Sequence, residues 1–335
     1  MKKSSLPFLW TSALLAVAIL LSIAVGSVFI SPADVWRVLL GQATNETFKT
    51  ILWNIRLPRT VLIALVGAAL AGSGASYQGL FRNPLADPYL IGVASGAGLG
   101  AVLAMSIQWP YSLLGLISVP AAAFVASLLT VALVYLFART SGGNVPTTNL
   151  ILAGVAVSSF TGSLTSFLML RSTGELRRAI SWLLGGVSLV SWPAILALLP
   201  YLAIGLTVLI LSGHALNLLQ FGDDQATQLG LDTRRAKITI ILAASLVTAA
   251  AVSFAGIIGF LGLIIPHVVR LFWGADYRRL IPLSILGGAS ALLLADVLAR
   301  IVLAPQELPV GIVTALAGAP FFLWVLRRAK GQGQW

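Results

Sequence analysis

Long apolar runs separated by short polar segments cover almost the entire chain. A helix of about 20 apolar residues is long enough to cross the roughly 30 Å hydrocarbon core of a bilayer. The pattern therefore predicts an all-α, polytopic membrane protein with ten membrane-spanning helices in a single transmembrane domain, residues 1–335. The predicted spans are residues 9–30, 60–80, 89–107, 113–137, 149–169, 193–212, 236–256, 258–273, 281–303 and 310–327.

The first apolar run follows Lys2 and Lys3, an arrangement that is also typical of a secretory signal. The run extends from Phe8 to Ile30, roughly 20 residues, which is enough to cross a bilayer. No small-x-small cleavage site stands out within it. We therefore interpret this segment as an uncleaved first helix.

Composition supports the membrane class. The chain is 58% hydrophobic and 9% charged, with a mean hydropathy of +0.98, whereas soluble domains carry about 25% charged residues. Cysteine is absent, which excludes disulfides, thiolate catalysis and cysteine-ligated metals. The net charge is +11, but the basic residues lie scattered at the ends of apolar runs, without interleaved aromatics. We therefore expect membrane lipid, and not nucleic acid, around this chain.

Ten spans place both termini on the same side of the membrane. With the termini in the cytoplasm, 13 of the 21 Lys and Arg residues fall in inner loops, as the positive-inside rule favours. The eight on the outer side need another explanation. They are Arg37, Lys49, Arg56, Arg59, Arg171, Arg177, Arg178 and Arg300.

Glycine and other small residues are concentrated in residues 67–74, 92–100 and 287–289. In a membrane, small residues at this spacing let two helix backbones approach closely. The sequence therefore predicts a tightly packed helix bundle.

The longest polar interruption is residues 213–237, here named the coupling loop. Asp223 is predicted to cap a short helix over 224–229, with Gly230 closing that helix, and a second short helix is predicted after Asp232. Composition leaves two interpretations open, a surface that a moving partner grips or a solvated connection between spans.

The chain carries no recognisable catalytic or metal-binding constellation. Of the five lysines, only Lys3 and Lys49 precede Ser or Thr, and neither follows a glycine-rich turn, so a Walker A motif is missing. His214 and His267 are isolated, whereas a metal site needs clustered ligands. We therefore expect no catalytic residue, metal or cofactor on this chain and interpret it as a non-enzyme.

Several motifs together resemble one family, the FecCD-type permease subunits of ABC importers for ferric siderophores, haem and cobalamin. They occur in the family's order along nearly the whole chain. The motifs are Arg56-Leu-Pro-Arg59, Asn83-Pro-Leu-Ala-Asp-Pro88 with Gly92, Gly259-Phe-Leu-Gly-Leu-Ile-Ile-Pro-His267, Leu294-Ala-Asp-Val-Leu-Ala-Arg300 and the segment from Glu307-Leu-Pro to Pro320.

The resemblance implies a type II ABC importer permease in the inner membrane of a prokaryote. It also implies a homodimer, two cytoplasmic ABC ATPase subunits that use ATP and Mg, and a bilobed substrate-binding protein, periplasmic or lipid-anchored. In the family, arginines matching Arg56, Arg59 and Arg300 face glutamates of the binding protein, and arginine's fork suits a carboxylate. Anchoring at the membrane interface by snorkelling is the alternative.

The same resemblance assigns residues at the inner side. The coupling loop is similar to the pair of helices that dock into the ATPase, with Asp223, Ala226, Leu229 and Gly230 in that segment. Two pairs of residues match the family's cytoplasmic gate, one pair just after the second span and one at the start of the fifth. For the pair at the start of the fifth span, ordinary helix capping is the alternative. The gate residues are Asn83, Leu85, Thr147 and Thr148.

For the substrate we expect an iron complex, a ferric siderophore foremost, because Arg171, Arg177 and Arg178 give the outer mouth a positive field. Cobalamin and haem are the alternatives. A secondary transporter would need buried acids to carry ions, and only Asp87 and Asp296 come near, both predicted close to interfaces. A membrane scaffold or receptor would not need a coupling loop.

Overall fold

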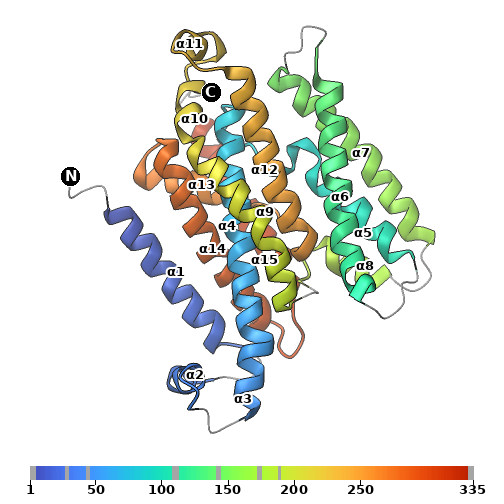
Figure 1. Cartoon of the computed structure of the whole chain (residues 1–335), viewed down its shortest axis with the longest axis vertical. Helices are drawn as coiled ribbons and strands as arrows, with labels where there is room; N and C mark the ends of the chain where they lie inside the picture. The colour runs from blue at the N-terminus through green and yellow to red at the C-terminus, as the bar shows by residue number, and fades with distance from the viewer. Residues whose placement is uncertain are drawn as a thin grey trace.

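The protein folds into a bundle of helices (Figure 1). The computed structural model describes residues 5–26, 30–42, 46–107, 113–140, 145–171, 176–187 and 190–330. Lys2, Lys3 and residues 27–29 of the first predicted span lie outside these ranges. Every regular element in the described ranges is helical, which confirms the all-α prediction.

The ten long or apolar helices coincide with the ten predicted spans. Among the described residues, seven are long and apolar enough to cross a membrane, and three have shorter apolar stretches. The seven are α1 (Leu6–Ala24), α4 (Leu57–Leu80), α6 (Leu113–Ala138), α7 (Thr147–Arg171), α9 (Trp192–Leu211), α12 (Thr233–Ala255) and α14 (Tyr277–Ile301). The three are α5 (Val93–Met105), α13 (Leu261–Trp273) and α15 (Val310–Lys330).

The structure corrects several boundaries. The span predicted over 89–107 is broken into a 3-10 turn, η3 (Pro88–Ile91), and α5, because Gly92 between them has φ +84°. The first helix ends at Ala24 instead of residue 30, with Val25 extended. The helix predicted from residue 258 begins at Leu261, after Phe260 in a left-handed conformation.

Short helices outside the ten predicted spans lie at the two ends of the bundle. The end drawn at the bottom of Figure 1, here the α2 end, carries α2 (Pro32–Leu39) and α3 (Glu46–Ile51). The opposite end, here the α11 end, carries α10 (Gly213–Leu219) and α11 (Asp223–Gln228). A π-helical segment, η2 (Leu52–Arg56), joins α3 to α4, and α8 (Leu176–Leu183) follows α7.

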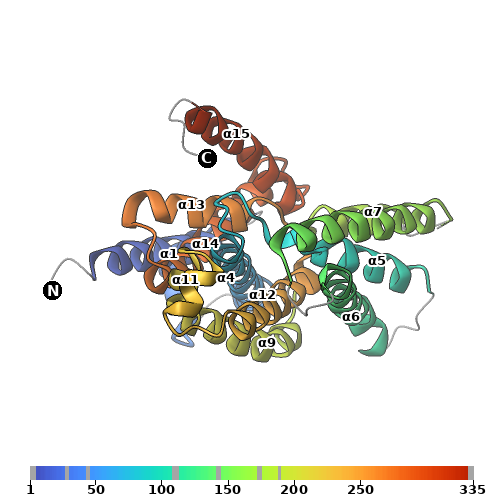
Figure 2. The same ribbon diagram turned by 90° about the horizontal axis from the view of Figure 1, so that it is seen from above.

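Helix α4 lies in the middle of the bundle and packs against α14, α12, α13 and α9 (Figure 2). At the crossing with α14, a Cβ on Gly67 would lie 2.3 Å from the carbonyl oxygen of Gly288. At the crossing with α13, a Cβ on Gly74 would lie 2.0 Å from the carbonyl oxygen of Gly262. Only glycine allows these contacts, which gives the predicted glycine-rich runs a packing role.

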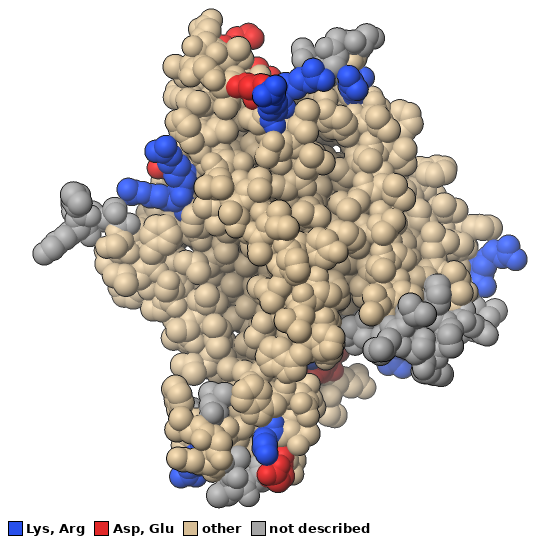
Figure 3. All heavy atoms as spheres, viewed as in Figure 1, with Lys and Arg blue, Asp and Glu red and all other residues tan. Residues whose placement is uncertain are grey.

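Charged side chains avoid the middle of the molecule. On the face drawn in Figure 3, they gather toward the two ends and the edges, and a nearly uninterrupted uncharged area lies between. Apolar side chains such as Leu133, Phe160 and Leu196 are exposed. An exposed apolar surface of this extent matches a hydrocarbon environment, so the chain is a membrane-spanning protein.

Candidate functional site

Two of the predicted docking arginines close the end of α1. The last carbonyls of a helix have no partner within it, and an unpaired carbonyl is costly away from water. Arg56 donates from Nη1 to the carbonyls of Ile23 and Ala24, at 2.7 and 3.0 Å. Arg300 donates from Nη1 to Val25, at 2.9 Å, and from Nη2 to Ser22, at 3.2 Å. Together the two guanidinium groups satisfy all four carbonyls.

A buried carboxylate holds two of these arginines together. Asp296 on α14 is 0% exposed, and its Oδ1 accepts from Nε and Nη2 of Arg59, at 3.1 and 2.9 Å. Its Oδ2 lies 3.0 Å from Nε of Arg300, one helical turn away. Asp296 is buried inside the bundle, where two cations compensate its charge; its predicted position near a membrane interface stays a prediction.

The three arginines differ in accessibility. The Arg56 and Arg300 residues are 5% and 6% exposed, whereas the side chain of Arg59 is 15% exposed and reaches the surface. There its Nη1 donates to Oε2 of Glu307 at 2.6 Å, and the Glu307 side chain is 52% exposed. Docking by the trio stays a prediction, and Arg59 is the member whose contact with solvent suits it best. Here we call Arg56, Arg59, Arg300, Asp296 and Glu307 the arginine cluster.

At the other end, α11 forms the exposed part of the coupling loop. Gly230 has φ +87°, and its N–H donates to Thr227 while that of Leu231 donates to Ala226. These two bonds are a Schellman closure, which confirms the predicted end of this helix. Ala226 lies on the inward face of α11 and is fully buried, whereas Leu229, at the end of α11, is 61% exposed. The loop therefore presents an apolar side chain on a firmly closed turn.

The predicted role of Asp223 as helix cap is wrong. Gly222 precedes the helix as its N-cap, and Asp223 is the first helical residue. Its carboxylate pairs instead with the ammonium of Lys237 on α12. The second short helix predicted after Asp232 is the start of α12 itself, with the Asp232 carboxylate capping the N–H of Arg235 at 2.9 Å.

Helix α10 fastens the coupling loop to two membrane helices. Gln220, which follows α10, donates from Nε2 to the carbonyl of Gly79 in the last turn of α4, at 2.9 Å. Asn217 donates to Asp276 at 2.7 Å and accepts from the N–H of Tyr277 at 2.9 Å, at the start of α14. The Asn217 hydrogen bond is the main reason that the pKa of Asp276 is lowered. A displacement of the loop would therefore be transmitted to α4 and α14.

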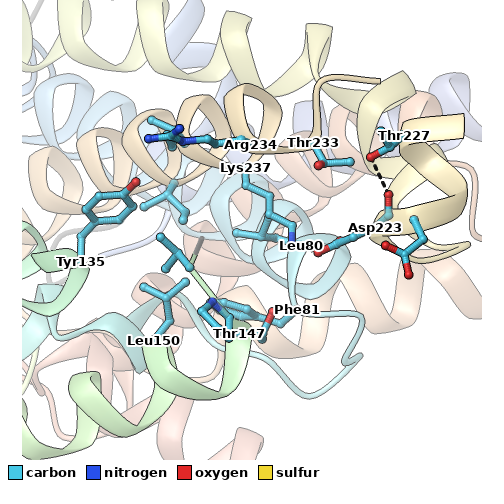
Figure 4. A pocket seen from close by; sticks show the side chains of 15 residues that line it. Leu80, Phe81, Tyr135, Thr147, Leu150, Asp223, Thr227, Thr233, Arg234 and Lys237 are labelled. Carbon is cyan, nitrogen blue, oxygen red and sulfur yellow. Dashed lines mark hydrogen bonds and ion pairs between the residues drawn. The ribbon is translucent and has the colours of Figure 1, made fainter. Parts of the chain in front are cut away.

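A cavity of about 430 Å³ lies beside α11, between the ends of α4, α7 and α12 (Figure 4). The residues that line it include Leu80, Phe81, Thr147, Asp223 and Lys237. The structure thus places one predicted gate residue and one predicted coupling residue around the same cavity.

The other gate residues do not line it. Thr148 is exposed on the first turn of α7, and the exposed Asn83 accepts from the N–H of Leu85 at 2.9 Å in a turn after α4. The outer-mouth arginines, Arg171 on α7 and Arg177 and Arg178 on α8, are all exposed. Their gate and mouth roles stay predictions.

Sequence reasoning missed Asp296 and Glu307 as members of the arginine cluster. Asp296 had a signal, because it lies four residues before Arg300 on a predicted helix and side chains at that spacing meet. Glu307 had no such signal in the sequence, because its partner Arg59 is 248 residues away.

The sequence profile of the FecCD transport family matches residues 14–328. The chain belongs to the FecCD transport family. An ABC transporter permease of Bacillus subtilis, YvrB, is 43% identical over 96% of this chain and 93% of its own length. The cobalamin import permease BtuC of Halobacterium salinarum is 48% identical over 84% and 74%, respectively. The hemin transport permease HmuU of Yersinia pestis is 42% identical over 89% of each chain.

A solved structure supports the same assignment. An inward-facing metal-chelate type ABC transporter superposes with a TM-score of 0.84 at 31% identity, covering 97% of this chain and 99% of that one. The protein is therefore an ABC importer permease with the fold that the motifs implied. Its relatives carry names that refer to cobalamin and hemin, so membership in the family alone does not select the substrate.

Proposed function

We propose that this protein is the membrane-spanning subunit of an ATP-driven importer that carries a metal chelate into a prokaryotic cell. The observation that carries the proposal is the family match over residues 14–328 of a chain whose α11 end presents a closed, partly apolar helix. ATP hydrolysis belongs to separate ABC ATPase subunits that use ATP and Mg. Two copies of the permease pair with two ATPases at the α11 end.

The orientation follows from charge. The α11 end carries Arg234, Lys237 and Arg278, in keeping with an excess of basic residues in cytoplasmic loops. Both termini are then cytoplasmic, and the α2 end faces a periplasmic or lipid-anchored substrate-binding protein in the inner membrane. Arg59 at that end is the proposed contact for a carboxylate of the binding protein.

A ferric siderophore is the proposed substrate, and the exposed Arg171, Arg177 and Arg178 support an anionic chelate. Cobalamin is the second candidate, because the relative from Halobacterium salinarum at 48% identity is a cobalamin import permease. Haem is a third, by the same argument from the Yersinia pestis relative.

A secondary transporter is disfavoured by the arginine cluster. Asp296 is a buried acid in a membrane helix, the kind of group that could carry a proton. It is paired with Arg59 and Arg300, so it belongs to a structural ion-pair network inside the bundle. Asp87, the other acid considered for that alternative, accepts from the N–H of Tyr89 at 2.8 Å, so both acids have structural partners.

The test is uptake into proteoliposomes that contain the permease and its ATPase. The binding protein encoded beside the permease gene is added after loading with ferric siderophore, cyanocobalamin or haemin. We expect uptake of one chelate, dependent on internal ATP and independent of a proton gradient. Uptake that follows the gradient without ATP would overturn the importer assignment, and uptake of cobalamin alone would overturn the siderophore.

Docking has its own test. Replacing all three arginines would leave the end of α1 unsatisfied, so Arg59→Gln alone is the informative variant. We expect it to weaken the complex with the binding protein, whereas Arg37→Gln, at an exposed position on α2 at the same end, serves as the matched control. Unchanged affinity for Arg59→Gln would remove Arg59 from the interface.

A further inference from the structure

We propose that Glu307 occupies Arg59 as a built-in stand-in for a partner's carboxylate, and that docking exchanges one carboxylate for the other. The inference rests on the proposed docking role of Arg59. It adds a regulatory element to that site, an internal carboxylate that competes with the partner for Nη1 of Arg59.

The geometry of Arg59 leaves one position for exchange. Its Nε and Nη2 are held by Asp296, which is fully buried on α14. Its Nη1 is held by Glu307 at 2.6 Å. Carboxylates thus engage three of the five N–H groups of Arg59, and an incoming carboxylate that takes the accessible Nη1 position competes there with Glu307.

Only Glu307 is placed to leave. It lies in the segment between α14 and α15, and its side chain is 52% exposed. The neighbouring backbone is anchored independently, because the N–H of Leu308 donates to the carbonyl of Ala299 at 3.0 Å. The carboxylate of Glu307 can therefore swing into solvent without unfolding the segment, whereas removing Asp296 would leave two cations buried without compensation.

Charge favours an incoming carboxylate over an empty position. The arginine cluster contains three arginines and two carboxylates, a formal charge of +1. Release of the Glu307 carboxylate raises the charge that remains around Arg59 to +2, in a partly buried position where interactions are stronger than in water. The vacated Nη1 matches the acceptor geometry of a glutamate or aspartate on a protein surface.

A competitor of this kind lowers the affinity of Arg59 for the partner's carboxylate. In its presence, the partner gains only the difference between two similar ion pairs, so the complex is weaker and releases more readily. Removing the competitor should tighten binding. An ion pair of this exposure is worth up to about 1 kcal/mol, so we expect a gain in affinity of about 2–5-fold.

The experiment measures binding of the substrate-binding protein encoded beside the permease gene to the permease–ATPase complex in nanodiscs, at low salt. The variants are Glu307→Gln, Arg59→Gln and the double variant. Glu46→Gln is the matched control, because Glu46 is an exposed acid at the α2 end that pairs with Lys49 and not with Arg59. Thermal unfolding of each complex checks that the bundle is intact.

We expect Glu307→Gln to bind more tightly than wild type, Glu46→Gln to bind as wild type, and Glu307→Gln to have no effect in the Arg59→Gln background. Equal or weaker binding of Glu307→Gln, with Arg59→Gln still weakened, would overturn the exchange and leave docking intact. Full affinity of Arg59→Gln would overturn docking itself. A gain from Glu307→Gln that persists without Arg59 would show a general charge effect and would also overturn the exchange.

Discussion

Arg56 holds the carbonyl oxygen of Ile23 at 2.7 Å, across 33 residues of sequence. The contact joins the start of α4 to the end of α1, which contacts the rest of the bundle mainly through α14. An arginine expected to face outward therefore completes the hydrogen bonding of another helix. Arg56 and Arg300 are buried and complete the end of α1, whereas Arg59 is partly open to solvent.

This relationship predicts the effect of Arg56→Lys. A single ammonium cannot reproduce the guanidinium contacts to two carbonyls, so the end of α1 should loosen at a cost of about 1–3 kcal/mol. Hydrogen exchange of a peptide that includes Ala24 and Val25 in nanodiscs measures it. Arg37→Lys is the control, because Arg37 is largely exposed on α2. Unchanged protection in Arg56→Lys would contradict the capping role.

The coupling surface predicts a second outcome. Leu229→Glu should abolish association with the ATPase while leaving the permease inserted, because a charge would replace the apolar side chain that is exposed at the tip of α11. Leu229→Met keeps an apolar side chain of similar size and should retain the complex. The amount of ATPase that co-purifies with each permease variant measures both effects. A full complement of ATPase with Leu229→Glu would rule out this surface.

The Asp223–Lys237 pair predicts a separation of stability from transport. Lys237→Met should change stability by no more than about 1 kcal/mol, since the pair lies near the surface. It should also free α11 from α12 and lower the amount of substrate imported per ATP hydrolysed. Exchanging the two charges in an Asp223→Lys, Lys237→Asp variant should restore part of the ratio. Unchanged uptake per ATP in Lys237→Met would show that this pair takes no part in coupling.

Asp276 predicts a pH effect at the α11 end. Its pKa is lowered below the ordinary 3.8, first of all by the Asn217 hydrogen bond. The charged form is the stabilised one, so its contribution is complete above about pH 4–5 and is lost as pH falls through the native pKa. The protection of the Arg278 and Arg279 amides against hydrogen exchange, relative to the intrinsic rate at each pH, should therefore fall on acidification below that range. Asp276→Asn should remove most of this pH dependence, and an unchanged profile in that variant would exclude Asp276 as its source.

The helices themselves were predictable from sequence, because in a bilayer an apolar run of sufficient length has few alternatives to helix. The ends of the helices were harder to predict. The break at Gly92 and the early end of α1 depend on backbone conformation and on distant donors, which leave no mark in hydrophobicity. Gly230 was identified correctly because a helix-closing glycine acts locally. Asp223 was misassigned because Lys237, its partner, lies on another helix.

Helix α4 carries Arg59 in its first turn and Gly79, the acceptor of Gln220, in its last. Its 24 residues make a rod about 36 Å long. The arginine cluster and the coupling loop are therefore attached to opposite ends of one rigid helix. A tilt of α4 would move both ends together, so the binding of a partner at one end would affect the other end without a relay of side chains.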